Sequence, residues 1–365
     1  MAVSFDTIPG SIRKPGAYLE FNTSLAVRTL PTNAQSICLV VPLDAGATVA
    51  ANTPTPVFSA PEALTKFGVV ASEMVAAIIA TYRYAAVSCV GVTVSGGTEP
   101  DLAAALASTA QGGFTLIVPA WYSQTALTAV RTHIATWTSS MEQQSIIGVG
   151  AVTTTLSTAT ALAASLNAGA ITVAVLPGTT ATARQVAAAY AALIASEEDP
   201  ARPLNTLVLT GISVPPIASR LGRTEQETCL ANGVTPLEVG AGDVVQVVRA
   251  VSTYTKSAAG ATDVSLLDLT TMRTLYYVRQ ACRDRIRLRF PRAKLSSKTP
   301  AAVRGELLDV LKKCEELEIV ENVDANADAL VVERSGQDVN RINAAIPADV
   351  VNGLHVFAGR IDLLL

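Results

Sequence analysis

The two histidines are the first residues to consider as catalytic groups, because imidazole is a common general base near neutral pH. His133 lies within the helical pattern AVRTHIATW, and His355 lies close to the C-terminus. Neither accompanies a recognisable nucleophile motif such as GxSxG. A lone histidine on a helix is more often packed or partly exposed than catalytic. We therefore do not expect hydrolase chemistry of the Ser/His/Asp or Cys/His kind.

The five cysteines are scattered along the chain and form no CxxC pair: Cys38, Cys89, Cys229, Cys282 and Cys314. An odd number without paired spacing argues against a disulfide framework, and the lack of clustered ligands argues against zinc. We therefore expect reduced thiols, synthesis in the cytosol, and neither a metal nor another cofactor.

Two glycine-bearing turns, VSGGTEP and VGAGDVV, suggest a nucleotide site, because α/β sheets bind phosphates where such turns meet helices. The first turn, at Gly96, lacks the Lys-Ser/Thr ending of a P-loop. The second has Gly240 and Gly242 but Val245 at the third glycine position, and a strand-like run follows it. Both are most simply turns, so an α/β enzyme or nucleotide-binding protein is the less favoured function.

A helix expected from Asp268 to Phe290 has one apolar and one cationic face. Its apolar positions are Leu275, Val278, Cys282 and Ile286. Arg279, Arg283 and Arg287 recur every fourth residue on another face. This cationic stripe is either a solvated or internally paired face, or a seat for a partner protein's acidic surface. A nucleic-acid site is the third interpretation, since no aromatic residues interleave with the stripe.

The order of the remaining elements predicts the fold class. From about residue 35 to 210, β-rich runs alternate with helical stretches, which predicts α/β layers with helices packed on a largely parallel sheet. After residue 218 the pattern changes to α+β. A second helix is expected from an N-cap at Thr299 to Glu316, and candidate strands of a small sheet follow it.

Composition argues against several classes of protein. Charged residues make up 16% and hydrophobic residues 50% of the 365-residue chain, yet no apolar run reaches the roughly 18 residues of a membrane-spanning helix. The N-terminus lacks the basic start and apolar core of a secretory signal. The net charge of −3 gives no global attraction to nucleic acid or anionic lipid. We expect a soluble protein that hides apolar surface against neighbours.

Both ends of the chain alternate apolar and polar residues, where most soluble proteins are polar and frayed. The apolar positions are Ala17, Leu19 and Phe21 at one end, and Ile361, Leu363 and Leu365 at the other. Each end therefore has the pattern of a strand that needs a sheet edge. That edge belongs either to the chain's own sheets or to another copy, which would make the protein a repeating building block.

Four segments, in order along the chain, resemble the contractile tail sheath proteins of Mu-like bacteriophages: IPGSIRKPGAYLEFN, LGRTEQETCLANGVTPLEV, RAVSTYTKSAAGATDVSLLDLTT and RDRIRLRFPRAKL. The resemblance is loose across the alanine-rich middle. It implies a structural, non-enzymatic protein that polymerises as a helical sleeve around a tail tube. The sleeve contracts to drive the tube through a bacterial envelope. A non-contractile lattice protein is a further alternative.

The resemblance also implies an organisation into arms and domains. The expected segments are an N-terminal arm (1–21), an α/β outer region (22–217), a tube-facing sheath domain (218–340) and a C-terminal arm (341–365). The arms, including Val356, would complete the small sheet of neighbouring subunits. The receiving strands are expected among residues 234–252 and 317–334.

The implied partners are further copies of the chain, the tail tube protein, and the baseplate and tail terminator proteins. Neither nucleic acid nor direct membrane contact is implied. The protein would be located in the virion tail after assembly in the cytoplasm of the bacterial host. The candidate tube-facing charges are Arg279, Arg283, Arg287, Lys312 and Lys313.

Overall fold

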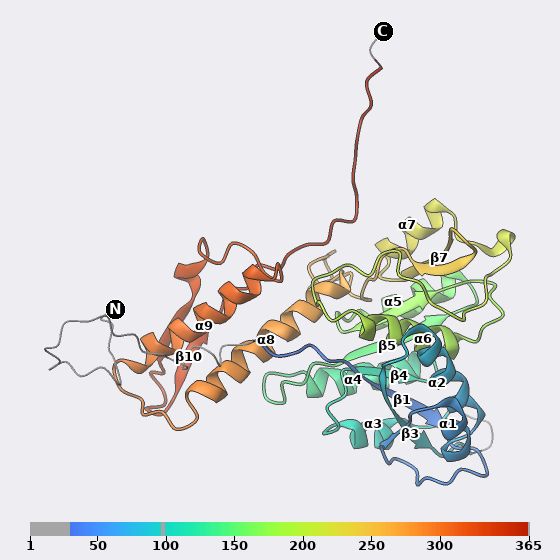
Figure 1. Ribbon diagram of the computed structural model, residues 1–365, viewed down its shortest axis with the longest axis horizontal. Helices are drawn as coiled ribbons and strands as arrows, with labels where there is room; N and C mark the ends of the chain where they lie inside the picture. The colour runs from blue at the N-terminus through green and yellow to red at the C-terminus, as the bar shows by residue number, and fades with distance from the viewer. Residues whose placement is uncertain (1–29, 96–98, 364–365) are drawn as a thin grey trace, which may run out of the picture.

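The computed structural model describes residues 30–95 and 99–363. A large α/β part occupies one end of the elongated molecule, and helix α8 (Leu269–Arg289) runs from it into a smaller part (Figure 1). Several predicted residues lie outside the described ranges: Ala17, Leu19, Phe21, Leu365 and the turn residue Gly96.

Within the described residues, eight strands form the large sheet, in the order β2-β3-β1-β4-β5-β6-β7-β8. The central strands run parallel, and the edge strands β2 and β8 pair antiparallel with their neighbours. The bounds are Ser36–Pro42 (β1), Thr55–Pro56 (β2), Ala86–Val92 (β3), Leu116–Pro119 (β4), Ile147–Val152 (β5), Ile171–Val175 (β6), Thr235–Gly240 (β7) and Val244–Val247 (β8). The predicted α/β class is confirmed.

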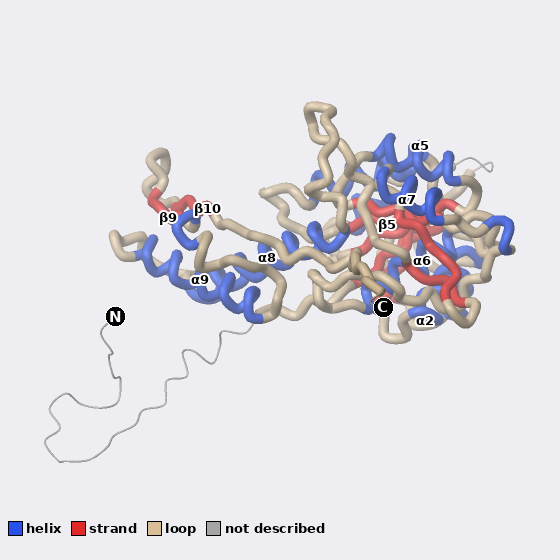
Figure 2. Tube along the Cα trace, turned by 90° about the horizontal axis from the view of Figure 1, so that it is seen from above, coloured by secondary structure: helices blue, strands red, loops and turns tan. Residues whose placement is uncertain are grey.

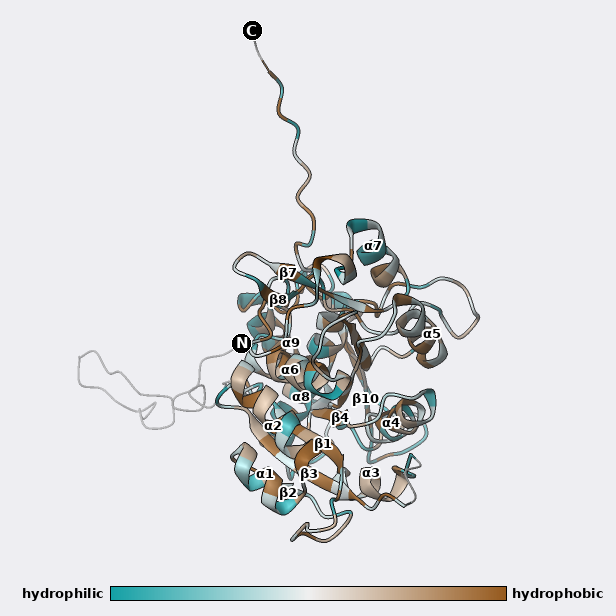
Figure 3. Cartoon of the chain, turned by 90° about the vertical axis from the view of Figure 1, so that its right-hand side faces the viewer, coloured by the Kyte–Doolittle hydropathy of each residue, from teal (hydrophilic) through white to brown (hydrophobic). Residues whose placement is uncertain are grey.

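Helices cover both faces of this sheet (Figure 3). Ile37, Leu39 and Val41 of β1 belong to the core on one face, and Cys38 and Val40 belong to the core on the other, as strand alternation requires. The first core includes α1 (Ala60–Lys66), α2 (Val69–Thr81) and α6 (Ala183–Ser196). The second includes α3 (Ala103–Thr109), α4 (Gln124–Trp137), α5 (Leu156–Leu166) and α7 (Arg223–Ala231). No helix in the described part is long and apolar enough to span a membrane.

The small part consists of α8, α9 (Thr299–Glu316) and a strand pair, β9 (Val331–Arg334) and β10 (Ile342–Ala345), which lies apart from the large sheet (Figure 2). Two 3₁₀ turns, Ile217–Ser219 and Ala327–Ala329, are the other short elements. The bounds of α8 and α9 agree with the predicted helices to within a residue. Thr299 is not the N-cap, because its hydroxyl bonds with the backbone of Lys294 and Ser296 in the preceding turn.

Strands β7 and β8 belong to the large sheet, although they follow residue 218 in the chain. The outer edge of β8 is already bonded to residues 206–209. Thr206 N donates to Val247 O at 2.8 Å, and Leu209 N donates to Val245 O at 2.8 Å. The prediction that strands among residues 234–252 receive an arm is therefore wrong, since the same chain occupies that edge. The boundary at residue 218 stays a prediction, but the large sheet does not end there.

A buried hydroxyl cluster ties α6 to the centre of the large sheet. The Tyr190 hydroxyl lies 3.1 Å from Thr172 Oγ1 and 3.3 Å from Thr235 Oγ1. Both threonine hydroxyls donate to the carbonyl oxygen of Val251. Burial raises the pKa of Tyr190, so its hydroxyl stays protonated and can donate in turn to a threonine oxygen.

Replacing Tyr190 by Phe should lower the free energy of unfolding by about 1–3 kcal/mol, because both threonine hydroxyls lose a buried partner. Equilibrium urea denaturation measures the change. The matched control is Tyr84→Phe, since the Tyr84 side chain is exposed; its effect should stay below about 0.5 kcal/mol. Equal effects of the two substitutions would contradict a stabilising role for the cluster.

Candidate functional site

A groove of about 760 Å³ lies between α8 and β10 in the small part. Its apolar lining comes from α8, the turn after it, α9 and β10: Leu275, Val278, Cys282, Ile286 and Phe290 on or beside α8, Ala293 and Leu295 in the turn, Val303 and Leu307 on α9, and Ile342, Ala344, Ile346 and Ala348 on β10 and the residues after it. Arg279, Arg283 and Arg287 of α8 line the groove as well. The apolar residues on α8 are the predicted apolar face of that helix. This face is therefore only partly covered by the subunit's own small sheet.

β10 forms one wall of the groove and is an edge strand. Ile342 and Ala344 line the groove, whereas the intervening Asn343 and Ala345 do not. β10 pairs with β9 on one side and with no strand of the described chain on the other. A two-stranded sheet is marginally stable alone, and an open edge is a template for another strand. The groove therefore has room for a third strand with one apolar face.

The predicted C-terminal arm, residues 341–365, belongs in part to the subunit's own small sheet, because Ile342–Ala345 form β10 and Val350 forms a bridge with Val320. The C-terminal segment, defined as residues 352–363, forms no strand, and beyond His355 it projects away from both parts of the molecule (Figure 1). The predicted arm residues Val356, Ile361 and Leu363 are 78%, 98% and 82% exposed. Leu354 and Phe357 are also exposed and were not among the predicted arm residues; Leu354 alternates with Val356, whereas Phe357 directly follows Val356 and interrupts the alternation. Within the described chain, this segment does not pair with the subunit's own sheets.

His355 holds the base of the C-terminal segment against the large part. Its Nδ1 accepts a hydrogen bond from the Asn205 side-chain amide at 2.9 Å, which leaves the ring proton of the neutral imidazole on Nε2. Nε2 lies 3.4 Å from Oδ1 of Asp268. Arg249 binds both carboxylate oxygens of Asp268, at 2.9 and 2.7 Å. Burial raises the pKa of Asp268, but the bonds from His355 and Arg249 outweigh burial and bring it to about 2.

Two of the predicted tube-facing arginines bind the subunit's own backbone. Arg279 donates to the carbonyl oxygens of Thr138 and Gln144, and Arg283 donates to that of Gln143 at 3.0 Å. These carbonyls belong to the loop after α4. Arg279 and Arg283 therefore attach α8 to the large part, whereas the remaining arginine of the stripe, Arg287, is exposed.

Other charges of the small part are paired within it, and Arg285 of α8 pairs with acids of α9, as the internally paired interpretation anticipates. The buried Arg285 contacts Asp309 at 2.6 Å and Glu306 at 3.1 Å. Lys312 contacts Asp324 at 2.8 Å, and Lys313 lies 3.5 Å from Asp309. In the part of the chain that the structure describes, no group of His, Cys, Asp or Glu side chains could hold a metal ion.

Two family models match the chain in succession. The model described as phage tail sheath protein central domain matches residues 95–253, and the phage tail sheath C-terminal domain matches residues 261–363. A curated relative, the Mu-like prophage FluMu tail sheath protein of Haemophilus influenzae, is 35% identical over 192 residues. The alignment covers 49% of this chain and 39% of that relative's length.

Solved structures share the fold at low sequence identity. The sheath tail protein from Desulfitobacterium hafniense is 11% identical, with a TM-score of 0.64 over 93% of this chain and 97% of that one. A chain of the anti-feeding prophage helical sheath in its contracted state is 14% identical, with a TM-score of 0.64 over 97% of this chain and 99% of that one. The likeness therefore extends over both the large and the small part.

Asp268→Asn should reduce stability above about pH 4 and have a smaller effect in acid. The pKa of Asp268 is about 2 in the folded protein against 3.8 ordinarily, so its contribution is present above the ordinary value and disappears as the pH falls towards 2. Partial exposure limits this contribution to about 1–2 kcal/mol. Denaturant unfolding over an acid-to-neutral pH series measures the difference from wild type.

The matched control is Glu227→Gln, because Glu227 is an exposed carboxylate on α7. Its stability should follow that of wild type at every pH. A constant gap between wild type and Asp268→Asn across the series would show that the carboxylate charge of Asp268 does not stabilise the base of the C-terminal segment.

Proposed function

Because this chain belongs to the phage tail sheath family, we propose that it is the repeating structural subunit of a contractile tail sheath. Copies polymerise as a helical sleeve around a tail tube, and contraction of the sleeve drives the tube through the host envelope. The subunit acts by assembly and rearrangement, not by catalysis. Its partners are further copies, the tail tube, and the baseplate and terminator proteins of a virion tail that assembles in the host cytoplasm.

One observation carries the proposal: a single chain has an exposed apolar segment that points away and an apolar groove beside an open strand edge. Segment and groove are different surfaces, so a contact between them on two copies is heterologous. Heterologous contacts that do not close into a ring produce a helical filament. This is the symmetry that a sleeve requires.

The C-terminal segment of one copy adds to β10 of a neighbour as a third strand. Its alternate side chains, among them Ile361 and Leu363, enter the groove over α8. Burying each such side chain contributes about 1.5–3 kcal/mol, and backbone hydrogen bonds fix the position. The N-terminal arm, residues 1–21, lies outside the described residues and is assigned by the same logic to the other edge, along β9, within the expected receiving strands 317–334.

Strand addition is also compatible with contraction of the sleeve, because it allows subunits to move while they stay connected. Its bonds run between backbones, so a paired arm can stay in place while the rest of the subunit rotates about the chain that leads to it. The extended sleeve is then a kinetically trapped state whose subunit faces repack when the baseplate releases them. A gain of about 1–3 kcal/mol per subunit would add up over a long sheath.

The hydrogen bonds and ion pairs within the subunit reduce the set of residues that could face the tube. Arg279 and Arg283 bind backbone carbonyls of the large part, whereas Lys312 and Lys313 form ion pairs with Asp324 and Asp309. Arg287 and Lys312 are the exposed candidates, and Arg287 also lines the groove. Arg287 lies at the exposed end of α8. Replacing these residues would affect tube coating and leave the interior of the subunit intact.

Ala344→Asp should prevent polymerisation without unfolding the subunit. Ala344 is exposed and lines the groove, so the carboxylate meets water in the free subunit but an apolar strand in the polymer. Negative-stain electron microscopy of the purified protein measures the result: wild type forms tubes or short rods, and the variant forms none.

The matched control is Ala345→Asp, one residue along the same strand, because Ala345 is also exposed but does not line the groove. This variant should assemble as wild type does. Normal tubes from Ala344→Asp, or from a chain that lacks Asn352–Leu365, would refute strand addition in the groove. A wild-type protein that forms no ordered polymer under any condition would refute the sheath function itself.

A further inference from the structure

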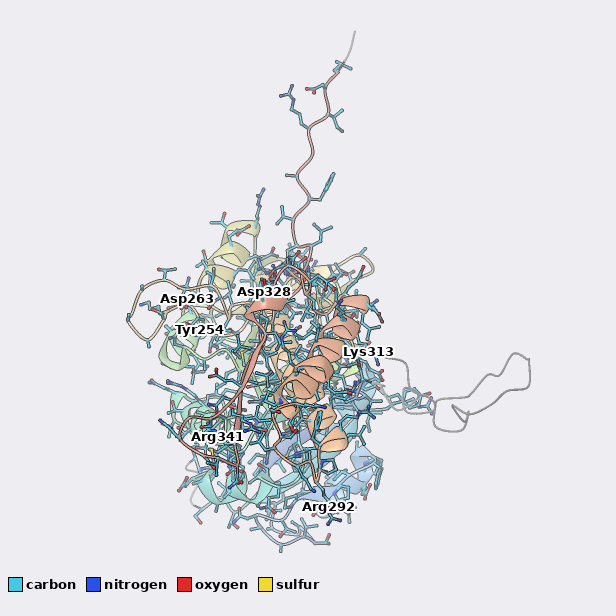
Figure 4. The ribbon with its side chains drawn as sticks, turned by 90° about the vertical axis from the view of Figure 1, so that its left-hand side faces the viewer. Tyr254, Asp263, Arg292, Lys313, Asp328 and Arg341 are labelled. Atoms are coloured by element: carbon cyan, nitrogen blue, oxygen red, sulfur yellow. The ribbon has the colours of Figure 1, made fainter. Side chains whose placement is uncertain are left out.

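Opposite charges are gathered at the two ends of α9. The last residues of α8 and the turn that follows, residues 287 to 298, contain Arg287, Arg289, Arg292, Lys294 and Lys298 and no acid. Residues 315–328, at and after the other end of the helix, contain Glu315, Glu316, Glu318, Glu321, Asp324 and Asp328 and no Lys or Arg. The small part therefore has a basic and an acidic end, with Arg292 and Asp328 on opposite sides of it (Figure 4).

Some of these charges are used within the subunit. Arg289 contacts Glu306 at 3.2 Å, Lys312 contacts Asp324 at 2.8 Å, and Glu315 accepts the amide of Val323. The basic turn is the set of exposed bases that follow α8, namely Arg292, Lys294 and Lys298; Arg287 is also exposed but lies on α8 and lines the groove. The acidic end is defined by the exposed residues Glu316, Glu318, Glu321 and Asp328.

The stability of one subunit explains only part of this arrangement. A helix favours acids at its N-terminus and bases at its C-terminus, so the bases at and after the end of α8 suit that helix, and Lys313 suits the last turn of α9. The acidic end is not explained in this way, because it follows the C-terminus of α9, and the first turn of α9 holds no acid. The 18 residues of α9 also separate the two ends by about 27 Å, several times the Debye length of about 8 Å in physiological salt. The ends therefore cannot neutralise each other within one molecule.

We propose that the basic turn of one subunit docks against the acidic end of the next copy. The inference rests on the proposed function, because a helical polymer places copies head to tail and so brings unlike ends together. The complementary surface is present on the chain itself, which favours a second copy over the tail tube as the occupant. Unlike charges at this junction speed the encounter, and like charges oppose it.

Charge reversal at either end should hinder polymerisation, and reversal at both ends should restore it. The basic-turn variant is Arg292→Glu, Lys294→Glu, Lys298→Glu, and the acidic-end variant is Glu316→Lys, Glu318→Lys, Glu321→Lys. Each alone places like charges at every junction and should raise the critical concentration for assembly at least about tenfold. A chain with both sets, and an equal mixture of the two variants, should form tubes at nearly the wild-type concentration.

Light scattering and negative-stain microscopy without tube protein give the readout, and thermal unfolding checks that each variant folds. The tube-free assay separates the possible occupants. Basic-turn variants that assemble normally alone but fail to coat purified tubes would assign the turn to the tube and overturn the proposal. A mixture that yields only closed dimers, or stays unassembled, would also overturn it.

The same assay distinguishes this inference from the function on which it rests. If wild type forms tubes and the charge variants form them equally well, only the head-to-tail junction is refuted. If wild type forms no tubes, the sheath function is refuted as well.

Discussion

A strand edge without a partner is the constraint on which the rest of this structure depends. Backbone donors and acceptors at an edge need hydrogen-bond partners, and an apolar groove beside the edge needs apolar cover. Among residues 30–95 and 99–363, residues 206–209 cover the edge of β8, whereas no strand pairs with the outer edge of β10. In the proposed polymer, the incomplete sheet of the small part is the surface that relates one copy to the next.

The exposed apolar side chains of the C-terminal segment also indicate a surface that needs a partner. Isolated apolar residues are common on protein surfaces, but Val356, Ile361 and Leu363 lie along one projecting segment. Such a segment is a liability in a free monomer, because any edge strand could capture it. His355 limits the risk by fixing where the segment leaves the subunit, through Asn205 and Asp268.

The sequence predicts the layers and helices well because burial leaves a periodic pattern. The alternation of β1 and the helical spacing of Leu275, Val278 and Cys282 each report a covered face. Periodicity does not say which sheet a strand joins, so β7 and β8 are assigned to the large sheet only by the structure. The partners of Arg279 and Arg283 are also hidden from the sequence, since backbone carbonyls are present at every residue.

Helix α8 contributes to two hydrophobic cores at once. Leu269 and Tyr276 pack in a core of the large part, and Val278 and Cys282 pack in the core of the small part. A continuous helix resists bending, and Arg279 also anchors its middle to the loop after α4. A rotation of the small part is therefore transmitted through α8, as a rigid helix, to the large part. It would not be absorbed by bending within α8.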